Sequence, residues 1–245
     1  SDFKFISEIK LTFDTSCCEI MNDGKIVCNS RSYEDNDLGN HYFVIVDSVY
    51  NPIRTIIEKN FKSGYGTGPS KMIYKVGDDV FAYTPFLPEI YKISSDKTEE
   101  AFRLSFGNYS IPPLDFLMEK SNGGKKSYFG ALEESNYVSY YNISEASDYM
   151  SVVYIVNKQK YIGFYDKRNG KTYVYKLEFF QERLGVSDSY TYLAGMIDDC
   201  CVVPLDINAL IDLKDDGYEF PVELSSLVEK AGADDNPILL TVRLK

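Results

Sequence analysis

Apolar and polar residues alternate in short runs along most of this chain, and residues that favour turns separate the runs. Alternation with a period of two is typical of β-strands, because successive side chains point to opposite faces of a sheet. In the first half the pattern predicts strands at residues 3–11, 17–21, 25–28, 41–47, 53–59, 72–76, 80–84, 89–93 and 101–106. In the second half it predicts strands at residues 137–143, 149–156, 160–166, 172–177, 195–197, 201–205 and 237–244.

Other segments depart from this alternation. Residues 112–120 are expected to form a short helix or an irregular excursion, whereas 207–213 and 224–231 carry helical spacing near the carboxyl end. The glycine-containing stretches 62–70 and 121–126 are expected to be exposed loops. The chain is therefore predicted to be an all-β protein with short helices near its carboxyl end.

The strands fall into groups of about four. Such groups recur at about 40 to 50 residues in β-propellers, in which each group forms one four-stranded blade. The run 78–83 followed by 89–93 is loosely echoed by 160–166 followed by 170–175. Strands spaced by about 8 to 12 residues also suit a β-sandwich, so the spacing leaves both architectures open.

The balance of charged residues limits the kinds of partner that the chain is expected to bind. The chain holds 26 Lys and Arg residues against 37 Asp and Glu residues, a formal net charge of −11. An acidic surface of this size repels a phosphate backbone, so nucleic acid is not an expected partner. No apolar run is long enough to span a membrane, and the first ten residues lack the features of a signal peptide. Because the chain does not begin with Met, we expect that a segment upstream has been removed.

Five cysteines are present without metal-binding or redox spacing: Cys17, Cys18, Cys28, Cys200 and Cys201. We interpret most of them as small apolar residues on strands. The turn at Asn22-Asp23-Gly24-Lys25 lies between Cys17 or Cys18 and Cys28, so one of these two could form a bridge to Cys28 across a hairpin.

Candidate catalytic groups are few. His41 is the single histidine, which excludes a zinc site with two imidazole ligands from one chain. It lies at the start of a predicted strand, and no serine occurs in a GxSxG motif, so a catalytic triad is not predicted. The segment Gly64–Pro69 lacks the Lys-Ser/Thr of a phosphate-binding loop and is interpreted as a connection between strands.

Acidic pairs and tyrosines are the remaining candidates. The acidic pairs could supply oxygen ligands for Ca²⁺ but lack the spacing of a calcium loop, and turn caps explain them more simply: Asp78-Asp79, Asp198-Asp199, Asp215-Asp216 and Asp234-Asp235. A second group of residues could form a stacking platform for a sugar or peptide, although packing between sheets is the simpler interpretation: Tyr137, Tyr140, Tyr141 and Tyr149. The sequence assigns no residue a catalytic, cofactor-binding or metal-binding role.

Several phrases resemble the six-bladed β-propeller family found as predicted lipoproteins and exported proteins of Bacteroides-type bacteria. The resemblance rests on five segments of the sequence: YTPFLPEIYKI at 83–93, Phe106-Gly107, Ile111-Pro112, SEASDY at 144–149 and DNPIL at 235–239. The resemblance runs from about Phe3 to Lys245. It implies a single β-propeller domain over residues 1–245, with four-stranded antiparallel blades.

The strands suffice for about four blades, so the resemblance also implies a carboxyl-terminal portion, or a shortened member, that lacks the first two. Open blade faces would then be covered by a partner, and a homodimer is expected. The implied location is the periplasm or cell surface, and the implied function is a noncatalytic binding or scaffold module for a glycan, peptide or protein. The alternative is a propeller hydrolase or lyase assisted by a divalent cation such as Ca²⁺.

Overall fold

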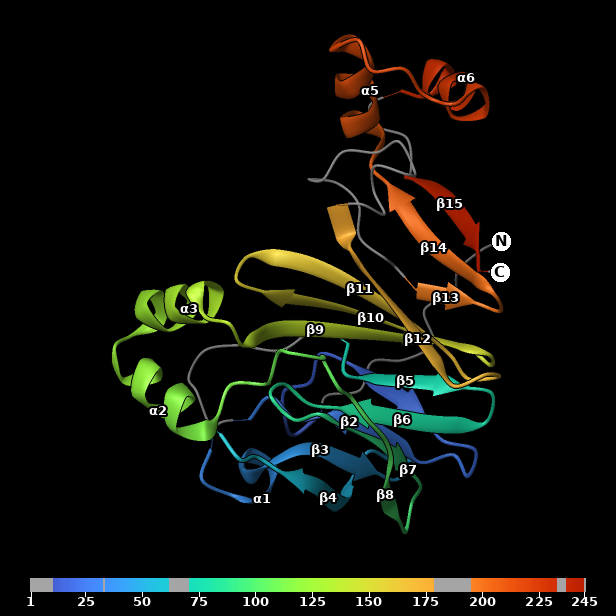
Figure 1. The fold of residues 1–245 in the computed structure, drawn as a ribbon. Coiled ribbons are helices and arrows are strands. Elements are labelled where there is room, and N and C mark those ends of the chain that lie inside the picture. The colour runs from blue at the N-terminus through green and yellow to red at the C-terminus, as the bar shows by residue number, and fades with distance from the viewer. Residues whose placement is uncertain (1–10, 33, 62–70, 179–194, 233–236, 245) are drawn as a thin grey trace. The chain divides into compact units, whose positions relative to one another are not determined.

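The predicted strands assemble into four antiparallel sheets in a computed structural model of the protein (Figure 1). The structure describes residues 11–32, 34–61, 71–178, 195–232 and 237–244. Within each four-stranded sheet the strands lie in the order in which they occur in the chain. The predicted all-β fold of four-stranded antiparallel sheets is therefore confirmed.

The chain divides into two compact units. Unit 1 comprises Ser1–Ser105 and Pro112–Tyr128, and unit 2 comprises Phe106–Ile111 and Phe129–Lys245. The first sheet of unit 1 contains β1 (Cys18–Ile20), β2 (Ile26–Asn29), β3 (His41–Val46) and β4 (Pro52–Glu58). Its second sheet contains β5 (Ile73–Val76), β6 (Asp79–Tyr83), β7 (Glu89–Ile93) and β8 (Thr98–Arg103), and its helices are α1 (Asp37–Asn40) and α2 (Leu114–Asn122).

Unit 2 also holds two sheets. The larger contains β9 (Val138–Glu145), β10 (Tyr149–Val156), β11 (Gln159–Asp166) and β12 (Lys171–Lys176). The smaller contains β13 (Gly195–Ile197), β14 (Cys200–Leu205) and β15 (Ile238–Arg243). Two helices, α5 (Ile207–Asp215) and α6 (Val222–Lys230), lie between β14 and β15 in the chain, and α3 (Lys125–Glu134) runs from unit 1 into unit 2.

The predicted loop over residues 121–126 is wrong. Helix α2 continues to Asn122 and α3 begins at Lys125, so that only Gly123 and Gly124 separate them. Gly124 has a φ of +86°, a conformation that glycine adopts at little cost and that lets the chain turn between two helices. Tyr128 and Leu132, four residues apart on α3, are both buried.

Smaller differences concern the strands. Strand β8 begins at Thr98 and ends at Arg103, earlier than the run at residues 101–106 that predicted it. Except for Leu11, the strand predicted at residues 3–11 lies outside the described residues, as does the predicted glycine-rich loop at 62–70.

Strand β3 is buried on both faces. Its Phe43 and Ile45 belong to one apolar cluster, whereas its Val44 and Val46 belong to another on the opposite face, which includes Phe13. All four of the β3 residues have no exposed surface. A strand covered on both faces is typically apolar throughout rather than alternating, as the sequence HYFVIV of β3 is.

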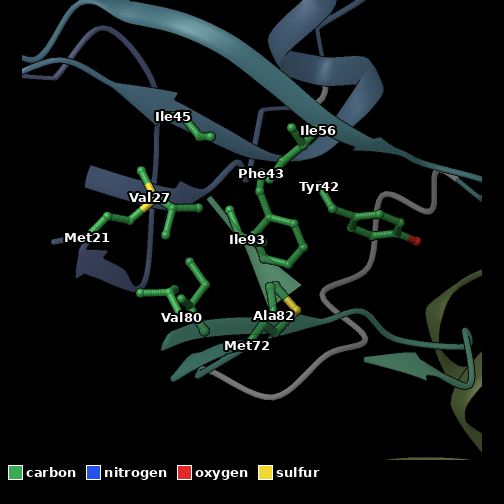
Figure 2. Close-up of a cluster of buried hydrophobic side chains, with 11 residues drawn as sticks. Met21, Val27, Tyr42, Phe43, Ile45, Ile56, Met72, Val80, Ala82 and Ile93 are labelled. Atoms are coloured by element: carbon green, nitrogen blue, oxygen red, sulfur yellow. The ribbon is translucent and has the colours of Figure 1, made fainter. Parts of the chain in front are cut away.

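The larger cluster joins the two sheets of unit 1. Figure 2 shows side chains of the first sheet, among them Phe43 and Val27, facing side chains of the second sheet, among them Val80 and Ala82. Ile93 of β7 is a member of the same cluster. Burial of these apolar surfaces is the main stabilising contribution to the packing of one sheet on the other.

Polar contacts link the turns of the same two sheets. The Ser95 hydroxyl donates a hydrogen bond to the carboxylate of Asp23, from the turn between β7 and β8 to the turn between β1 and β2. Arg54 of β4 donates to the Thr98 hydroxyl at 3.0 Å. Lys75 of β5 donates to the Ile20 carbonyl oxygen at 3.2 Å. These contacts fix how the sheet ends align.

A buried asparagine organises the segment before β1. The side-chain oxygen of Asn29 accepts hydrogen bonds from the Thr15 hydroxyl at 2.8 Å and from the backbone amides of Ser16 and Cys17 at 2.8 and 2.9 Å. Its amide nitrogen donates to the Ser16 hydroxyl at 2.9 Å. Asn29 is 1% exposed, so this set of bonds satisfies a polar group that would otherwise be costly to bury.

Of the two pairings left open by the sequence, the structure has the bridge between Cys18 and Cys28. These residues lie directly opposite each other on β1 and β2, with Cα atoms 4.1 Å apart. Cys17, Cys200 and Cys201 are free thiols. The buried Cys201 agrees with its interpretation as a small apolar residue, and burial raises the pKa of its thiol to about 12.

The core of unit 2 extends from the larger sheet to the helices. Ile162 and Phe164 of β11 share an apolar cluster with Val203 of β14 and Leu210 of α5. Helix α5 begins after Asp206, whose carboxylate accepts hydrogen bonds from the first-turn amides. The helices between β14 and β15 therefore continue the core of the unit.

Replacement of Phe43 with Ala is expected to lower the free energy of unfolding by about 3–5 kcal/mol, because it removes a fully buried ring and leaves a cavity. Ile20 on β1 is 60% exposed, so Ile20→Ala is the matched control, with an expected change within about 0.5 kcal/mol. Urea unfolding of both variants measures the difference. Equal effects would contradict the assigned core.

Loss of the Cys18–Cys28 bridge is expected to lower the free energy of unfolding by about 2–3 kcal/mol, because the bridge restricts the unfolded chain. The test compares urea unfolding of the protein with that of a Cys18→Ser/Cys28→Ser variant, each with and without reductant. The reductant should affect only the first protein. A reductant effect that persists in the variant would show that another pair is bridged.

The free energy of unfolding is expected to decrease at low pH because the Asp23 carboxylate becomes protonated. The Ser95 hydroxyl, followed by the Lys25 ammonium group, lowers the pKa of the Asp23 carboxyl from 3.8 to about 2. A lowered pKa in the folded state contributes stability above about pH 4 that is lost as the pH falls towards 2. The wild-type protein should therefore be more stable than Asp23→Asn at pH 7, with a smaller difference at pH 2.

Chemical denaturation at several pH values measures that difference. Ser95→Ala serves as the companion variant, since it removes the donor and should reduce the same pH dependence. A stability difference between wild type and Asp23→Asn that stays constant from pH 7 to pH 2 would contradict the assignment.

Candidate functional site

A cavity of about 260 Å³ lies in unit 1 between the end of β4 and helix α2. Asn60 and Phe61 reach it from the segment after β4, and Met118, Ser121 and Asn122 reach it from α2. The two wall segments are distant in the chain and meet only through the fold. Ligand pockets of roughly 300–1,000 Å³ hold drug-sized molecules, so this cavity suits a smaller one.

The hydrogen bonds of the wall set the orientation of its polar groups. The Tyr42 hydroxyl donates to the side-chain oxygen of Asn60 at 3.2 Å, which directs the Asn60 amide nitrogen elsewhere as a donor. Burial raises the pKa of Tyr42 to about 12, so this hydroxyl keeps its proton at neutral pH. The Ser121 hydroxyl donates to the Met118 carbonyl oxygen at 2.9 Å and retains acceptor capacity.

The aromatic side chain of the wall, Phe61, is supported by a buried tyrosine. The ring of Phe61 stacks on that of Tyr128, with centroids 6.1 Å apart and planes inclined by 23°. Tyr128 has no exposed surface, so it gives Phe61 a fixed support. A supported aromatic ring can contact an apolar ligand face with little loss of conformational entropy.

The described residues of the wall carry no formal charge. Its five side chains are two amides, a hydroxyl, a thioether and an aromatic ring, and none of them is an acid or a base. Such a wall can donate and accept hydrogen bonds and cover an apolar surface. Among the described lining residues there is neither a counter-ion for a charged ligand nor a proton-transfer group.

Among the residues that the structure describes, those singled out from the sequence do not line this cavity. His41 lies at the start of β3, and its Nδ1 donates to the Asp37 carbonyl oxygen at 2.8 Å, which ties it to α1. The segment Gly64–Pro69 lies outside the described residues. Among the residues described, no group of three or more His, Cys, Asp or Glu side chains is placed to hold a metal ion.

The acidic pairs occupy turns and a helix end. Asp79, at the start of β6, pairs with Lys92 at 2.6 Å. Asp199, between β13 and β14, pairs with Arg243 at 3.2 Å. Asp215 and Asp216 end α5, and the pair at 234–235 lies outside the described residues. Asp78 and the pair Asp198-Asp199 lie in turns, as interpreted, whereas Asp79 begins a strand and Asp215 lies in a helix.

Two of the four tyrosines considered as a stacking platform are buried, as the packing interpretation expects. Tyr141 and Tyr149 are 3% and 4% exposed. Tyr141 packs against Phe106, and the ring of Tyr149 lies 4.6 Å from the guanidinium carbon of Arg168. Tyr137 and Tyr140 are half-buried. Packing within unit 2, the simpler interpretation, explains the buried pair.

Sequence reasoning missed every residue of the cavity wall. Asn60 and Phe61 follow a strand without any motif, and Ser121 and Asn122 fell in the segment predicted as a loop. The spacing of Tyr128 and Leu132 could have revealed α3 and the end of α2 before it. No pattern in the sequence predicts that α2 lies beside the end of β4.

Comparisons with known proteins identify the family. Residues 1–204 match the model of a family described as a 6-bladed beta-propeller. A crystal structure of a "putative exported protein" from Bacteroides fragilis is 45% identical, with a TM-score of 0.91. The match covers 100% of this chain and 69% of that chain. The search of curated proteins found no match.

The fold agrees with this family. The described residues form four sheets, three of which have four strands in chain order, as propeller blades do. None of the helices in the described part of the chain combines the length and hydropathy needed to cross a bilayer. The resemblance inferred from the sequence is confirmed, and the chain belongs to this family of six-bladed β-propellers.

Proposed function

We propose that this chain is a noncatalytic binding module at the cell envelope and that the cavity of unit 1 takes a neutral sugar. The observation that carries the proposal is the wall of the cavity, whose described residues combine amide and hydroxyl groups with a supported aromatic ring and carry no charge. A sugar ring matches these groups, because it carries hydroxyls at its rim and C–H groups on its face.

Each wall element has a role in this proposal. The amides of Asn60 and Asn122 bind ring hydroxyls, since an amide offers both a donor and an acceptor. The ring of Phe61 covers the C–H face of the sugar. Ser121 accepts a further hydroxyl hydrogen, and Met118 fills the remaining apolar contact. The small volume favours one sugar unit, such as the end of a glycan.

The other expected partners fit this wall less well. A peptide segment with a charged side chain would leave its charge without a counter-ion in the cavity, which costs free energy. A hydrolase or lyase needs a group that transfers protons or polarises the bond, and none of the described wall residues supplies one. Binding of a neutral ligand uses the groups that are present.

Two observations support the location at the cell envelope. The Bacteroides fragilis relative is described as exported. The bridge between Cys18 and Cys28 suits an oxidising compartment outside the cytoplasm. The exported location of the relative is carried over to this chain only as part of the proposal.

Saturation-transfer NMR with a panel of neutral hexoses and N-acetylhexosamines tests the proposal. Asn122→Ala and Phe61→Ala should each weaken binding by about 2- to 12-fold, the range expected from loss of a contact of about 0.5–1.5 kcal/mol. Asn108→Ala is the control, because Asn108 is an exposed asparagine of unit 2.

Two results would contradict the proposal. Saturation transfer that is the same in Phe61→Ala, Asn122→Ala and Asn108→Ala would place the sugar elsewhere. Tighter binding of glucuronic acid than of glucose would show that the site selects charge, which its wall does not explain.

A further inference from the structure

Strand β12 forms an open edge of the larger sheet of unit 2. It pairs with β11 on one side, and among the described residues no strand pairs with its other side. All six of its positions are exposed, including Tyr173 at 47%, Val174 at 51% and Tyr175 at 40%. A terminal strand directs alternate N–H and C=O groups away from its sheet, so β12 offers a template for a further strand.

The last strands of the other four-stranded sheets are better protected. Strand β4 begins with Pro52, and its pairing with β3 shifts register between Ile45 and Val46. The pairing of β8 with β7 also shifts register, and β8 carries consecutive glutamates at 99 and 100. Proline, bulges and repeated charge are devices that discourage strand addition. The edges formed by β4 and β8 each carry such features.

Strand β12 lacks these interruptions. It pairs with β11 without a register shift over its whole length, from Lys171 opposite Asp166 to Lys176 opposite Tyr161. It contains no proline, and its four central residues are Thr172, Tyr173, Val174 and Tyr175. β-Branched and aromatic residues of this kind favour cross-strand pairs.

The charged residues of β12 indicate which kind of peptide this edge can bind. The only charged residues of β12 are its end residues, Lys171 and Lys176, and neither has an ion-pair partner among the described residues. The chain as a whole is acidic, with a formal net charge of −11. A strand with a positive residue at each end is thus locally complementary to an added strand with acidic ends.

We propose that β12 binds an extended peptide by strand addition, and that the peptide carries acidic residues flanking a run of alternating apolar residues. The backbone of the peptide pairs with the open edge of β12, as in other complexes formed by β-augmentation. Apolar side chains of the peptide contact Tyr173 and Tyr175 on one face and Val174 on the other. The acidic residues pair with Lys171 and Lys176.

A second copy of this chain is a poorer occupant of the same edge. Antiparallel pairing of β12 with itself over its full length places Lys171 opposite Lys176 of the second copy, and this happens at both ends of the pair. Like charges directly opposite each other on neighbouring strands are destabilising. The lysines therefore disfavour self-association while they favour an acidic peptide.

The test uses the full chain and a random linear peptide library displayed on phage. Enriched peptides should have acidic residues on both sides of alternating apolar residues. A fluorescent copy of an enriched peptide should bind Lys171→Glu/Lys176→Glu about tenfold more weakly than wild type, since two favourable pairs become repulsive. Thermal melting of the variant checks that it is folded.

The matched control is Lys97→Glu/Lys158→Glu, which changes the net charge equally at lysines that are 66% and 61% exposed. It should change the affinity less than twofold. Hydrogen exchange measured by mass spectrometry should show slower exchange of β12 amides when the peptide is bound.

Three results would overturn the proposal. The first is a library selection that enriches no acid-flanked peptide, or enriches peptides that bind both double variants alike. The second is a bound peptide that leaves exchange of the β12 amides unchanged. The third is a dimer by light scattering whose β12 amides are protected without peptide, which would make a second copy the occupant.

Discussion

Burial of both faces of the central strands is the constraint on which this structure depends. Strand β3 places Phe43 and Ile45 in one cluster and Val44 and Val46 in another. A single sheet cannot cover both faces of such a strand, so the sheet needs packed layers on either side. In unit 1 the second sheet covers one face of β3, and the cluster that includes Phe13 covers the other. In unit 2, one face of β11 shares a core with β14 and α5.

Polar contacts fix the alignment of sheets and strands, which apolar packing alone does not determine. Apolar surfaces have little directional preference, so burial alone does not fix how two sheets align. In unit 1 the side chain of Asn29 holds the segment before β1, and the contact between Asp23 and Ser95 joins the turns of two sheets. The bridge between Cys18 and Cys28 then fixes the pairing of β1 with β2.

The proposed binding sites lie where this packing ends. The cavity beside α2 is lined by residues that follow β4 or belong to α2, and its described residues, which carry no charge, suit a neutral polar ligand. Strand β12 lies at the edge of its sheet, where side chains and backbone groups remain accessible. Functional residues of β-rich folds are often found at such margins, because the interior residues are constrained by packing.

The sequence by itself determined the strands and most of their turns, because a period of two and local turn chemistry are properties of neighbouring residues. The family came from the resemblance of several phrases to known members. It could not determine the environment of each strand. Both a stacking platform and packing were open for Tyr141 and Tyr149, and contacts with Phe106 and Arg168 decide for packing. Helix α3 was missed because two adjacent glycines suggested a loop. The cavity wall joins the end of β4 to α2, and only tertiary packing brings segments so distant in the chain together.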